Sequence, residues 1–199
     1  MIVLDIETSG LYPEKHGIWQ IGALDFYDPE NTFLEEARID DEDEISQDAL
    51  EVTRKTEEYL RDDSKISQRE LISRFFEWTN SCSIKSFICQ NPQFDADFIN
   101  FKARKYNLKS PVHHRAFDLH TAASLKCYDV NGNFLIKEGH SDMGLANILK
   151  FCGMADNREA HNALEDARLT AECFSRILDG KSLFKAYKGY KIPRDLLTT

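Results

Sequence analysis

The chain contains 199 residues, 42% of them hydrophobic, with a formal net charge of −9 at pH 7, which fits one domain with a substantial core. No apolar run approaches the roughly 20 residues of a membrane-spanning helix and no signal-type apolar segment opens the chain, so the composition argues against a membrane protein and predicts a soluble, cytoplasmic one. Five scattered cysteines without a C-x-x-C pair predict reduced core thiols rather than disulfides or a zinc site.

The first part of the chain predicts strands. Residues 1–6 are almost continuously apolar, which is typical of a strand buried on both faces in a sheet covered by helices. Residues 17–27 and 31–39 follow with strand character, and the turn-forming sequence DPEN at 28–31 lies between them. This arrangement predicts a hairpin.

An acidic and helical region comes next. Residues 35–63 hold thirteen acids and four bases, whereas the rest of the chain holds twenty-one of each sign. The acidic run at 40–44 lacks the loop glycine and final glutamate of an EF-hand, so we expect a solvated loop rather than a calcium site. Apolar residues at helical spacing behind Ser N-caps predict helical structure over 46–60 and from Ser67 to about Thr79.

A strand, a helix and a short strand are predicted in the middle of the chain. Residues 83–90 have the character of a buried strand, and the turn signal Asn91-Pro92 ends it. Aromatic residues at helical spacing from Phe94 onward predict a helix that ends near Asn107. Residues 113–120 predict a short strand.

Two further helices and a basic segment complete the chain. One helix is expected over 141–153, with Ser141 as its cap and Gly153 as its stop, and another over 162–178, running into a glycine. The alternation of strands and helices predicts a mixed α/β sheet with helices on its faces. Residues 181–199 carry five bases and one acid between aromatic side chains, which fits either a solvated tail or a surface that binds a nucleic-acid backbone.

Two acids stand close together in the first strand, in the sequence VLDIETSG at residues 3–10. Asp5 and Glu7 point to the same face because side chains at i and i+2 of a strand do so. Two such carboxylates repel one another unless water or a cation separates them. The turn that follows lies where ligands collect in open α/β sheets, beyond the carboxyl end of a strand.

A second acidic position lies in NPQFDADFI, at residues 91–99. Asp95 falls in the first helical turn and shares the inward face with Phe98 and Ile99, which makes it the preferred site residue, with Asp97 as the alternative. A carboxylate there also complements the helix dipole, so helix-end electrostatics is a purely structural explanation for Asp95.

The third motif is HNALEDA, at residues 161–167. With Asn162 as the N-cap, Glu165 completes a capping box, and His161 and Asp166 take the two positions that contact one another in a helix staple. The contact is normally apolar, but here it would place an imidazole beside a carboxylate. A surface histidine near a helix-end acid is the structural alternative.

Taken together, the three motifs supply four carboxylates and one histidine: Asp5, Glu7, Asp95, Asp166 and His161. Hard oxygen ligands of this kind suit Mg²⁺ or Mn²⁺. Two such ions about 4 Å apart stabilise the attacking and leaving oxygens of a phosphoryl displacement. A histidine with a reference pKa near 6.5 can take a proton from the attacking water. The pattern predicts metal-dependent hydrolysis of a phosphate ester.

In this order, DIETSGL, NPQFDADF and HNALEDA resemble the three motifs of the DEDDh 3′→5′ exonucleases, the family of polymerase proofreading subunits and several RNA-trimming enzymes. The segments IWQIGAL, DALEVTRKTEEYL and GLANILKFCGM resemble the stretches between those motifs. A sister family carries Tyr four residues before the last Asp. Asn162 stands at that position here, and His161 lies five residues before Asp166, as in the histidine branch.

The resemblance implies an RNase H-like fold, an α/β structure with a five-stranded mixed sheet flanked by helices. The exonuclease domain would span residues 1–180, with 181–199 as a basic aromatic extension of the same domain. The four carboxylates would bind two divalent ions, Mg²⁺ or Mn²⁺, and His161 would be the general base. Nucleoside 5′-monophosphates would be released from single-stranded 3′ ends.

The resemblance also implies substrate contacts. Thr8 and Gly10 would contact the terminal nucleotide, while Asn91 and Phe94 would support the second motif. Two positions depart from the family pattern: Thr53-Arg54 stands where many members have a His-Gly turn, and Gln90 where many have His. Both lie outside the metal cluster and bear on substrate handling more than on the chemistry.

Several questions stay open at this level. We slightly favour DNA as substrate because the first motif is closer to the proofreading branch, with an RNA-trimming exoribonuclease as the alternative. A non-catalytic nucleic-acid-binding module would not need the acid cluster, which would repel a polyanion in the absence of metal. A polymerase or another protein partner could bind the C-terminal segment, and a homodimer is a further alternative.

Overall fold

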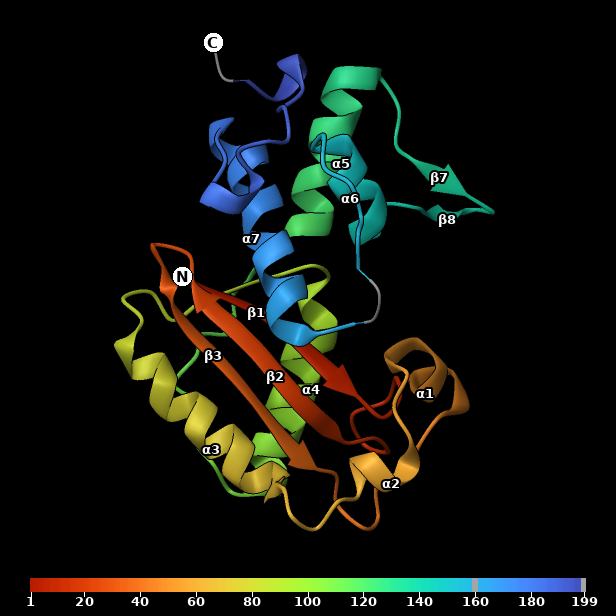
Figure 1. Ribbon diagram of the computed structural model, residues 1–199, viewed down its shortest axis with the longest axis vertical. Helices are drawn as coiled ribbons and strands as arrows, with labels where there is room; N and C mark the ends of the chain where they lie inside the picture. The colour runs from red at the N-terminus through yellow and green to blue at the C-terminus, as the bar shows by residue number, and fades with distance from the viewer. Residues whose placement is uncertain (159–160, 198–199) are drawn as a thin grey trace.

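The computed structural model describes residues 1–158 and 161–197. Its centre is a six-stranded mixed sheet with strand order β4-β3-β2-β1-β5-β6, and Figure 1 labels the three strands β1, β2 and β3 of this sheet. The strands are β1 (Ile2–Thr8), β2 (Ile18–Asp25), β3 (Asp28–Arg38), β4 (Ile66–Ser67), β5 (Phe87–Cys89) and β6 (Phe117–Asp118). The predicted mixed α/β class is confirmed. The expectation of five strands is wrong because β4, only two residues long, pairs in parallel with the end of β3 and is too short to show a strand pattern.

The strands β1, β2 and β3 form an antiparallel meander, and β5 and β6 extend the sheet in parallel. The predicted hairpin is present, but its turn lies at 26–27 rather than 28–31, because Asp25 pairs directly with Asp28. The buried Asp25 carboxylate holds this turn by accepting hydrogen bonds from Tyr27 N at 3.1 Å and from the amino group of Met1 at 3.0 Å. Pro29 is accommodated inside β3 between the paired residues Asp28 and Thr32, where the register with β2 shifts.

Helices cover both faces of the sheet. They are α1 (Gln47–Thr53), α2 (Glu57–Leu60), α3 (Gln68–Trp78), α4 (Pro92–Lys105), α5 (Leu119–Asn131), α6 (Leu145–Phe151) and α7 (Ala163–Asp179). A small separate hairpin consists of β7 (Ile136–Lys137) and β8 (His140–Ser141). One core cluster joins α3 and α4 to one face of the sheet, and a second joins α5, α6 and α7 to the other. No helix among the described residues is long and apolar enough to cross a membrane.

Three helical expectations need correction. The stretch 46–60 forms two helices, because Arg54 takes a left-handed conformation with φ 54° and Thr56 caps a new start. Helix α5 was not predicted, since its buried residues include the small Ala123 and Cys127 and give a weak apolar stripe. Ser141 lies in β8, and α6 begins after Gly144 instead.

Other helical expectations are confirmed. The Ser67 hydroxyl caps α3 by accepting from Glu70 N. Gly153 ends the α6 turn with φ 76°, and Gly180 ends α7 with φ 63°. Positive φ at a helix end favours glycine because it has no Cβ. All five cysteines are free and buried, as predicted for core thiols.

The two charged segments are more ordered than expected. Asp43, in the acidic run, is buried and pairs with the buried Lys102 at 2.6 Å, while Arg61 donates to backbone carbonyls of the same run. The prediction of a fully solvated loop is therefore wrong at Asp43. The solvated-tail alternative for the C-terminus is wrong as well, because its aromatic side chains at Phe184 and Tyr187 pack on the α7 side of the core.

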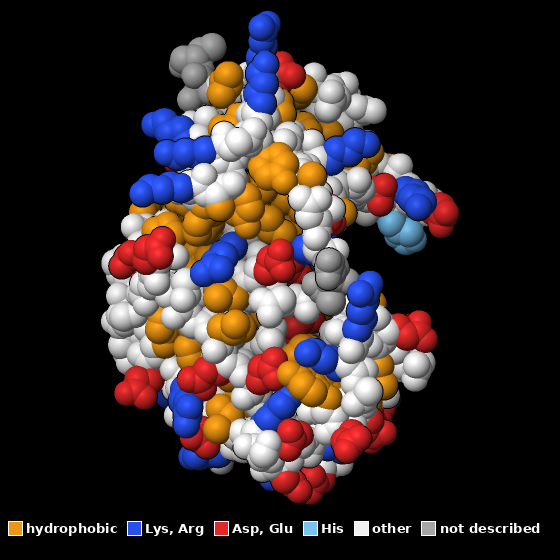
Figure 2. Space-filling model, in the orientation of Figure 1, with side chains coloured by type: hydrophobic (Ala, Val, Ile, Leu, Met, Phe, Trp, Pro, Cys, Tyr) orange, Lys and Arg blue, Asp and Glu red, His pale blue; other side chains and the backbone are white. Residues whose placement is uncertain are grey.

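The C-terminal segment is held by a buried ion pair on α7. Glu172 and Arg176 are fully buried and 2.7 Å apart. Glu172 Oε2 accepts hydrogen bonds from the backbone of Leu183 and Phe184, and Arg176 donates to three carbonyls, including that of Tyr187. Lys and Arg side chains gather on the surface of this segment (Figure 2), at the exposed Lys181, Lys185, Lys188 and Lys191.

Candidate active site

The first acidic pair lies on the sheet face that α7 covers. Asp5 is opposite Gly22 and Glu7 is opposite Gln20 in the antiparallel pair of β1 and β2. A Cβ atom on Gly22 would lie 2.1 Å from Leu164 N, so the start of α7 rests directly on β2 at this point. The close approach requires a glycine and brings the N-terminus of α7 beside the two acids.

A polar side chain in the sheet holds the start of α7. The Gln20 Oε1 atom accepts a hydrogen bond from Ala163 N at 2.8 Å, and the Asn162 side chain accepts one from Glu165 N at 3.1 Å. The predicted cap is therefore present. These bonds satisfy N–H groups that the first helical turn leaves free, and they fix the position of Asp166, whose side chain is buried.

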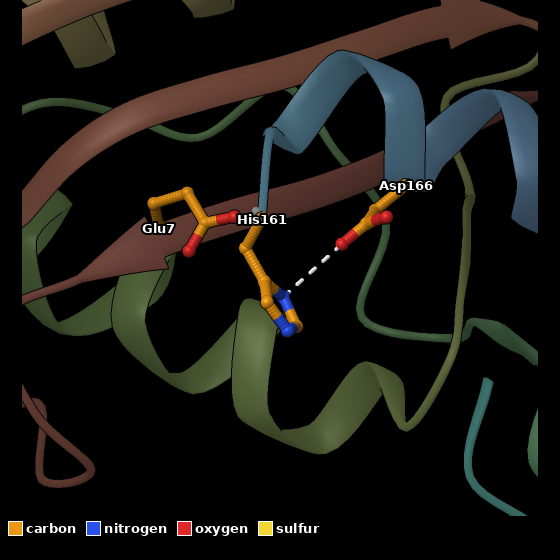
Figure 3. Close-up of side chains that lie close together, drawn as sticks. All are labelled: Glu7, His161 and Asp166. Atoms are coloured by element: carbon orange, nitrogen blue, oxygen red, sulfur yellow. Dashed lines mark ion pairs between the residues drawn. The ribbon is translucent and has the colours of Figure 1, made fainter. Parts of the chain in front are cut away.

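The predicted contact between His161 and Asp166 is present. His161 Nδ1 lies 3.2 Å from Asp166 Oδ2, and the imidazole is directed toward the carboxylate with Glu7 beside it (Figure 3). One ligand atom from each of these three residues lies within 4.8 Å of the others. The hydrogen bond with Asp166 and the charge of Glu7 raise the pKa of His161.

The start of α4 supplies the remaining acid. Asn91, with φ 67°, precedes Pro92 at the first position of the helix, a combination that ends the strand and starts the helix abruptly. Asp95 is buried, whereas Asp97 is exposed. Of the two acids considered from the sequence, Asp95 therefore points inward and Asp97 faces solvent. The negative charge of Asp95 acts on Asp5 and helps to raise its pKa.

The acids share a poorly solvated environment. Burial raises the pKa of Glu7 to about 7 and that of Asp95 to about 8. Burial, followed by the charges of Asp95 and Glu7, also raises the pKa of Asp5 well above its usual range. A carboxylate whose ionised form is this unfavourable gains strongly from a nearby cation.

One atom of this cluster is left without a partner. Glu7 Oε1 is buried and accepts no hydrogen bond among the described residues, an arrangement that normally costs free energy. A divalent metal ion would satisfy it, and the surrounding donors are oxygens of the type that Mg²⁺ and Mn²⁺ prefer. The residues present therefore fit a metal site.

A cavity of about 310 Å³ opens onto the cluster. Every predicted site residue lines it except Asp166, including Thr8, Gly10, Asn91 and Phe94. The walls from α1 and the first turn add apolar side chains, and the family departures at 53 and 90 line the cavity too. In Figure 2 the surface is indented on the side where α1 and the β7–β8 hairpin project.

The turn after β1 is tightly built. The Thr8 hydroxyl donates to Gly10 O at 2.7 Å, and a Cβ atom on Gly10 would lie 2.1 Å from the His16 ring. Ser9 links the turn to the acidic segment, because its hydroxyl donates to Glu44 O at 2.6 Å. These contacts hold the turn that directly follows Glu7 and β1.

Three residues near the site were not identified from the sequence. Gln20 and Gly22 hold the start of α7, and Arg158 donates to Asp166 Oδ1 at 3.0 Å. A signal for the first two exists, since IWQIGAL carries a polar and a small residue two positions apart within an apolar strand. No local pattern indicates Arg158, which lies outside any helix or strand.

Comparisons with known proteins identify related exonucleases. A family model described as Exonuclease (RNase_T) matches residues 2–174. The chain is 26% identical to Ribonuclease T of Vibrio vulnificus (strain CMCP6) over 210 residues, covering 98% of this chain and 89% of that protein. It is 29% identical to the 3′-5′ DNA exonuclease Cap18 of Escherichia coli over 182 residues, covering 89% and 90%.

Solved structures share the fold. The nuclease domain of 3′hExo, a DEDDh family member bound to rAMP, superposes with a TM-score of 0.67 at 18% identity over 92% of this chain and 94% of that one. E. coli Exonuclease I in complex with a dT13 oligonucleotide gives 0.68 at 18% identity over 88% and 40%. The match across residues 2–174 shows that the chain belongs to the RNase_T exonuclease family, the metal-dependent DEDDh 3′→5′ exonucleases with an RNase H-like fold.

Proposed function

We propose that this exonuclease uses two divalent ions to hydrolyse the terminal phosphodiester bond of single-stranded 3′ ends and releases nucleoside 5′-monophosphates, with DNA slightly favoured. The observation that carries the proposal is Glu7 Oε1, a buried atom without a hydrogen-bond partner among the described residues, within a cluster of acids that opens into a cavity. A divalent ion bound at the cluster would supply this buried oxygen with a partner.

The metal-binding residues in this proposal are Asp5, Glu7, Asp95 and Asp166, and the ions are Mg²⁺ or Mn²⁺. The bound ions would stabilise charge on the attacking and leaving oxygens of the phosphate. Support comes from the raised pKa values of Glu7 and Asp95 at about 7 and about 8, because both acids are desolvated and gain from cations.

His161 is the proposed general base. Its Nδ1 faces Asp166 at 3.2 Å, so an Nδ1–H donated to that carboxylate would leave Nε2 free to accept a proton from water. The side chain is 46% exposed, which gives a water molecule access to the ring. A neighbouring carboxylate also stabilises the imidazolium that forms after proton transfer.

The proposed binding site for the terminal nucleotide is the cavity beside the cluster. Thr8 and Gly10 line one wall, and Asn91 and Phe94 line another. Leu11, which is 70% exposed, adds an apolar surface that a nucleobase could cover. The cavity thus offers an apolar wall for a base and acids for the ions that would bind its phosphate.

The choice between DNA and RNA rests on the first motif, which favours DNA. The relatives' names include both a ribonuclease and a DNA exonuclease at comparable identity, 26% and 29%. RNA trimming therefore stays as the alternative substrate class. A non-catalytic binding module is disfavoured because every acid of the cluster is present and faces the same region.

The proposal extends to the organisation of the protein. We take residues 1–180 and the extension 181–199 as one domain, supported by the bonds from Glu172 and Arg176 to the extension.

Five free, buried thiols support a reducing, cytoplasmic location. The exposed lysines of the extension are the proposed docking site for a polymerase or another protein. A PolC-type DNA polymerase III of Thermotoga petrophila matches over 181 residues at 29% identity, 12% of that protein. A homodimer is the alternative assembly.

A degradation assay tests the proposal. Matched 5′-labelled single-stranded DNA and RNA oligonucleotides are incubated with the protein and Mn²⁺, with Asp5→Ala as the control. We expect a ladder that shortens from the 3′ end, faster on DNA than on RNA, and little cleavage by Asp5→Ala. A faster RNA ladder would transfer the proposal to the exoribonuclease alternative, and equal turnover by Asp5→Ala would refute the metal assignment.

A further inference from the structure

Arg158 is bound to two acids at the edge of the cluster. Its guanidinium donates to Asp166 Oδ1 at 3.0 Å through Nη1, and to both Asp156 oxygens at 2.8 and 2.7 Å through Nε and Nη2. The side chain is only 12% exposed, and that of Asp166 is 3% exposed. A bidentate pair of this kind is a strong, directional contact, so Asp156 holds the guanidinium beside Asp166.

The contact leaves Asp166 with no unused oxygen. Arg158 occupies Oδ1 and His161 occupies Oδ2. A divalent ion needs one of these oxygens to coordinate Asp166. A guanidinium at hydrogen-bond distance from that oxygen would also repel the ion across a poorly solvated space. Arg158 and a metal ion therefore compete for Asp166.

We propose that Arg158 is a positioning residue that takes the place of a metal ion at Asp166 and must release Asp166 Oδ1 before the ion can bind there. This inference rests on the proposed function, since it concerns the same metal site. Arg158 would hold Asp166 in its buried position while no metal is present. Because this contact must break first, the site would bind its first metal ion more weakly.

The second acid explains where the guanidinium goes. Asp156 belongs to none of the three motifs and binds Arg158 through both oxygens. After Asp166 is released, the Arg158–Asp156 pair can persist beside the cluster. The positive charge would then stay beside the acid cluster, where it would complement a phosphate group. Arg158 would thus stay bound to Asp156 throughout, and only its contact with Asp166 would be replaced by the metal ion.

The test is a Mn²⁺ titration of the full chain without nucleic acid, in which electron paramagnetic resonance measures the free ion. We compare the wild type with Arg158→Gln, Arg158→Lys and a control, Arg168→Gln, which changes an exposed arginine of α7. Arg158→Gln should bind Mn²⁺ more tightly, on the order of tenfold, because the competing charge is lost. Its metal-free melting temperature should fall, as shown by circular dichroism.

The other variants separate charge from fold. Arg158→Lys keeps a cation beside Asp166 and should restore affinity close to that of the wild type, while Arg168→Gln should change neither quantity. Unchanged or weaker Mn²⁺ binding by a folded Arg158→Gln would overturn the inference, even if the wild type binds Mn²⁺ and degrades DNA. If the wild type bound no Mn²⁺ and Asp5→Ala behaved identically, the proposed function would fail, and this inference with it.

Discussion

His161 Nδ1 lies 3.2 Å from Asp166 Oδ2, a contact between the residue before the cap of α7 and the fourth residue of that helix. These two positions usually carry apolar side chains that staple a helix start. Here the same geometry places a base beside an acid, so a common structural device becomes part of the site.

Replacing His161 with Gln should slow the chemical step by roughly 10²- to 10⁴-fold, because the proton acceptor is lost. Mn²⁺ affinity should stay close to that of the wild type. The two quantities are measured by single-turnover cleavage and by metal titration. A parallel loss of Mn²⁺ affinity would instead make His161 a metal ligand. That role would fit the short distances between its ring and the carboxylates of Glu7 and Asp166.

Without metal, the protein should lose stability as the pH rises from about 4 to about 8. Glu7 and Asp95 have folded-state pKa values of about 7 and about 8, above their ordinary values of 4.5 and 3.8. The folded form therefore retains protons that the unfolded chain releases in this window, and linkage makes the slope negative. The raised pKa of His161 acts in the same direction, because its stabilisation is lost as the pH passes that value.

Thermal unfolding in EDTA at pH 5, 6.5 and 8 measures this slope. Mn²⁺ should reduce it, since bound cations favour the ionised acids. Asp95→Asn should also flatten it, because the variant cannot ionise there. A metal-free melting temperature that rises steadily across the window would contradict the assigned environment of these acids.

Gly22→Ala should disturb the site from the opposite strand. The new Cβ would lie 2.1 Å from Leu164 N and 2.2 Å from Ala163 C, and these backbone atoms cannot rotate away. We expect a loss of about 1–3 kcal/mol in unfolding free energy from overpacking. Exonuclease activity should fall as well, because the added methyl group would push the start of α7 away from β2 and so move Asp166 away from Glu7.

Gly189→Ala is the matched control, because its added Cβ would meet no heavy atom of the described residues within 4 Å, apart from those of its own residue and its chain neighbours. Urea unfolding and the cleavage assay measure both variants. Wild-type turnover by a folded Gly22→Ala protein would show that the close approach of α7 to β2 does not position the site.

The packing of the C-terminal segment should depend on the buried ion pair between Glu172 and Arg176 of α7. Removing one partner, as in Arg176→Met, leaves Glu172 buried and unpaired and should cost about 3–5 kcal/mol. It also removes donors to the carbonyls of Cys152, Tyr187 and Tyr190. Residues 181–191 should then be cleaved sooner in limited proteolysis.

Lys188→Gln, an exposed change in the same segment, should leave both measurements near those of the wild type. Equal protease resistance of Arg176→Met would mean that apolar packing alone holds the segment. Because the segment is part of the packed structure, charge reversal of its exposed lysines is a cleaner test of partner binding than its deletion.

Local chemistry in the sequence determined much of this protein. The spacing of Asp5 and Glu7 places both on one face of a strand, and the cap at Asn162 sets the contact between His161 and Asp166. Such statements hold because strand alternation and helix capping depend on a few adjacent residues. Together with the motifs, they predicted the fold class, the family and several of the residues that line the cavity.

Contacts between distant segments were decided by the tertiary structure. Gln20 and Ala163 are 143 residues apart in the chain, and their bond exists only because α7 packs on β2. Likewise, the acidic run becomes partly buried because α4 brings Lys102 to Asp43. Arg158 lies in no helix or strand, and its contact with Asp166 follows no sequence period. Side-chain periodicity describes one element at a time, whereas burial and charge pairing depend on which elements pack together, and only the folded chain decides that.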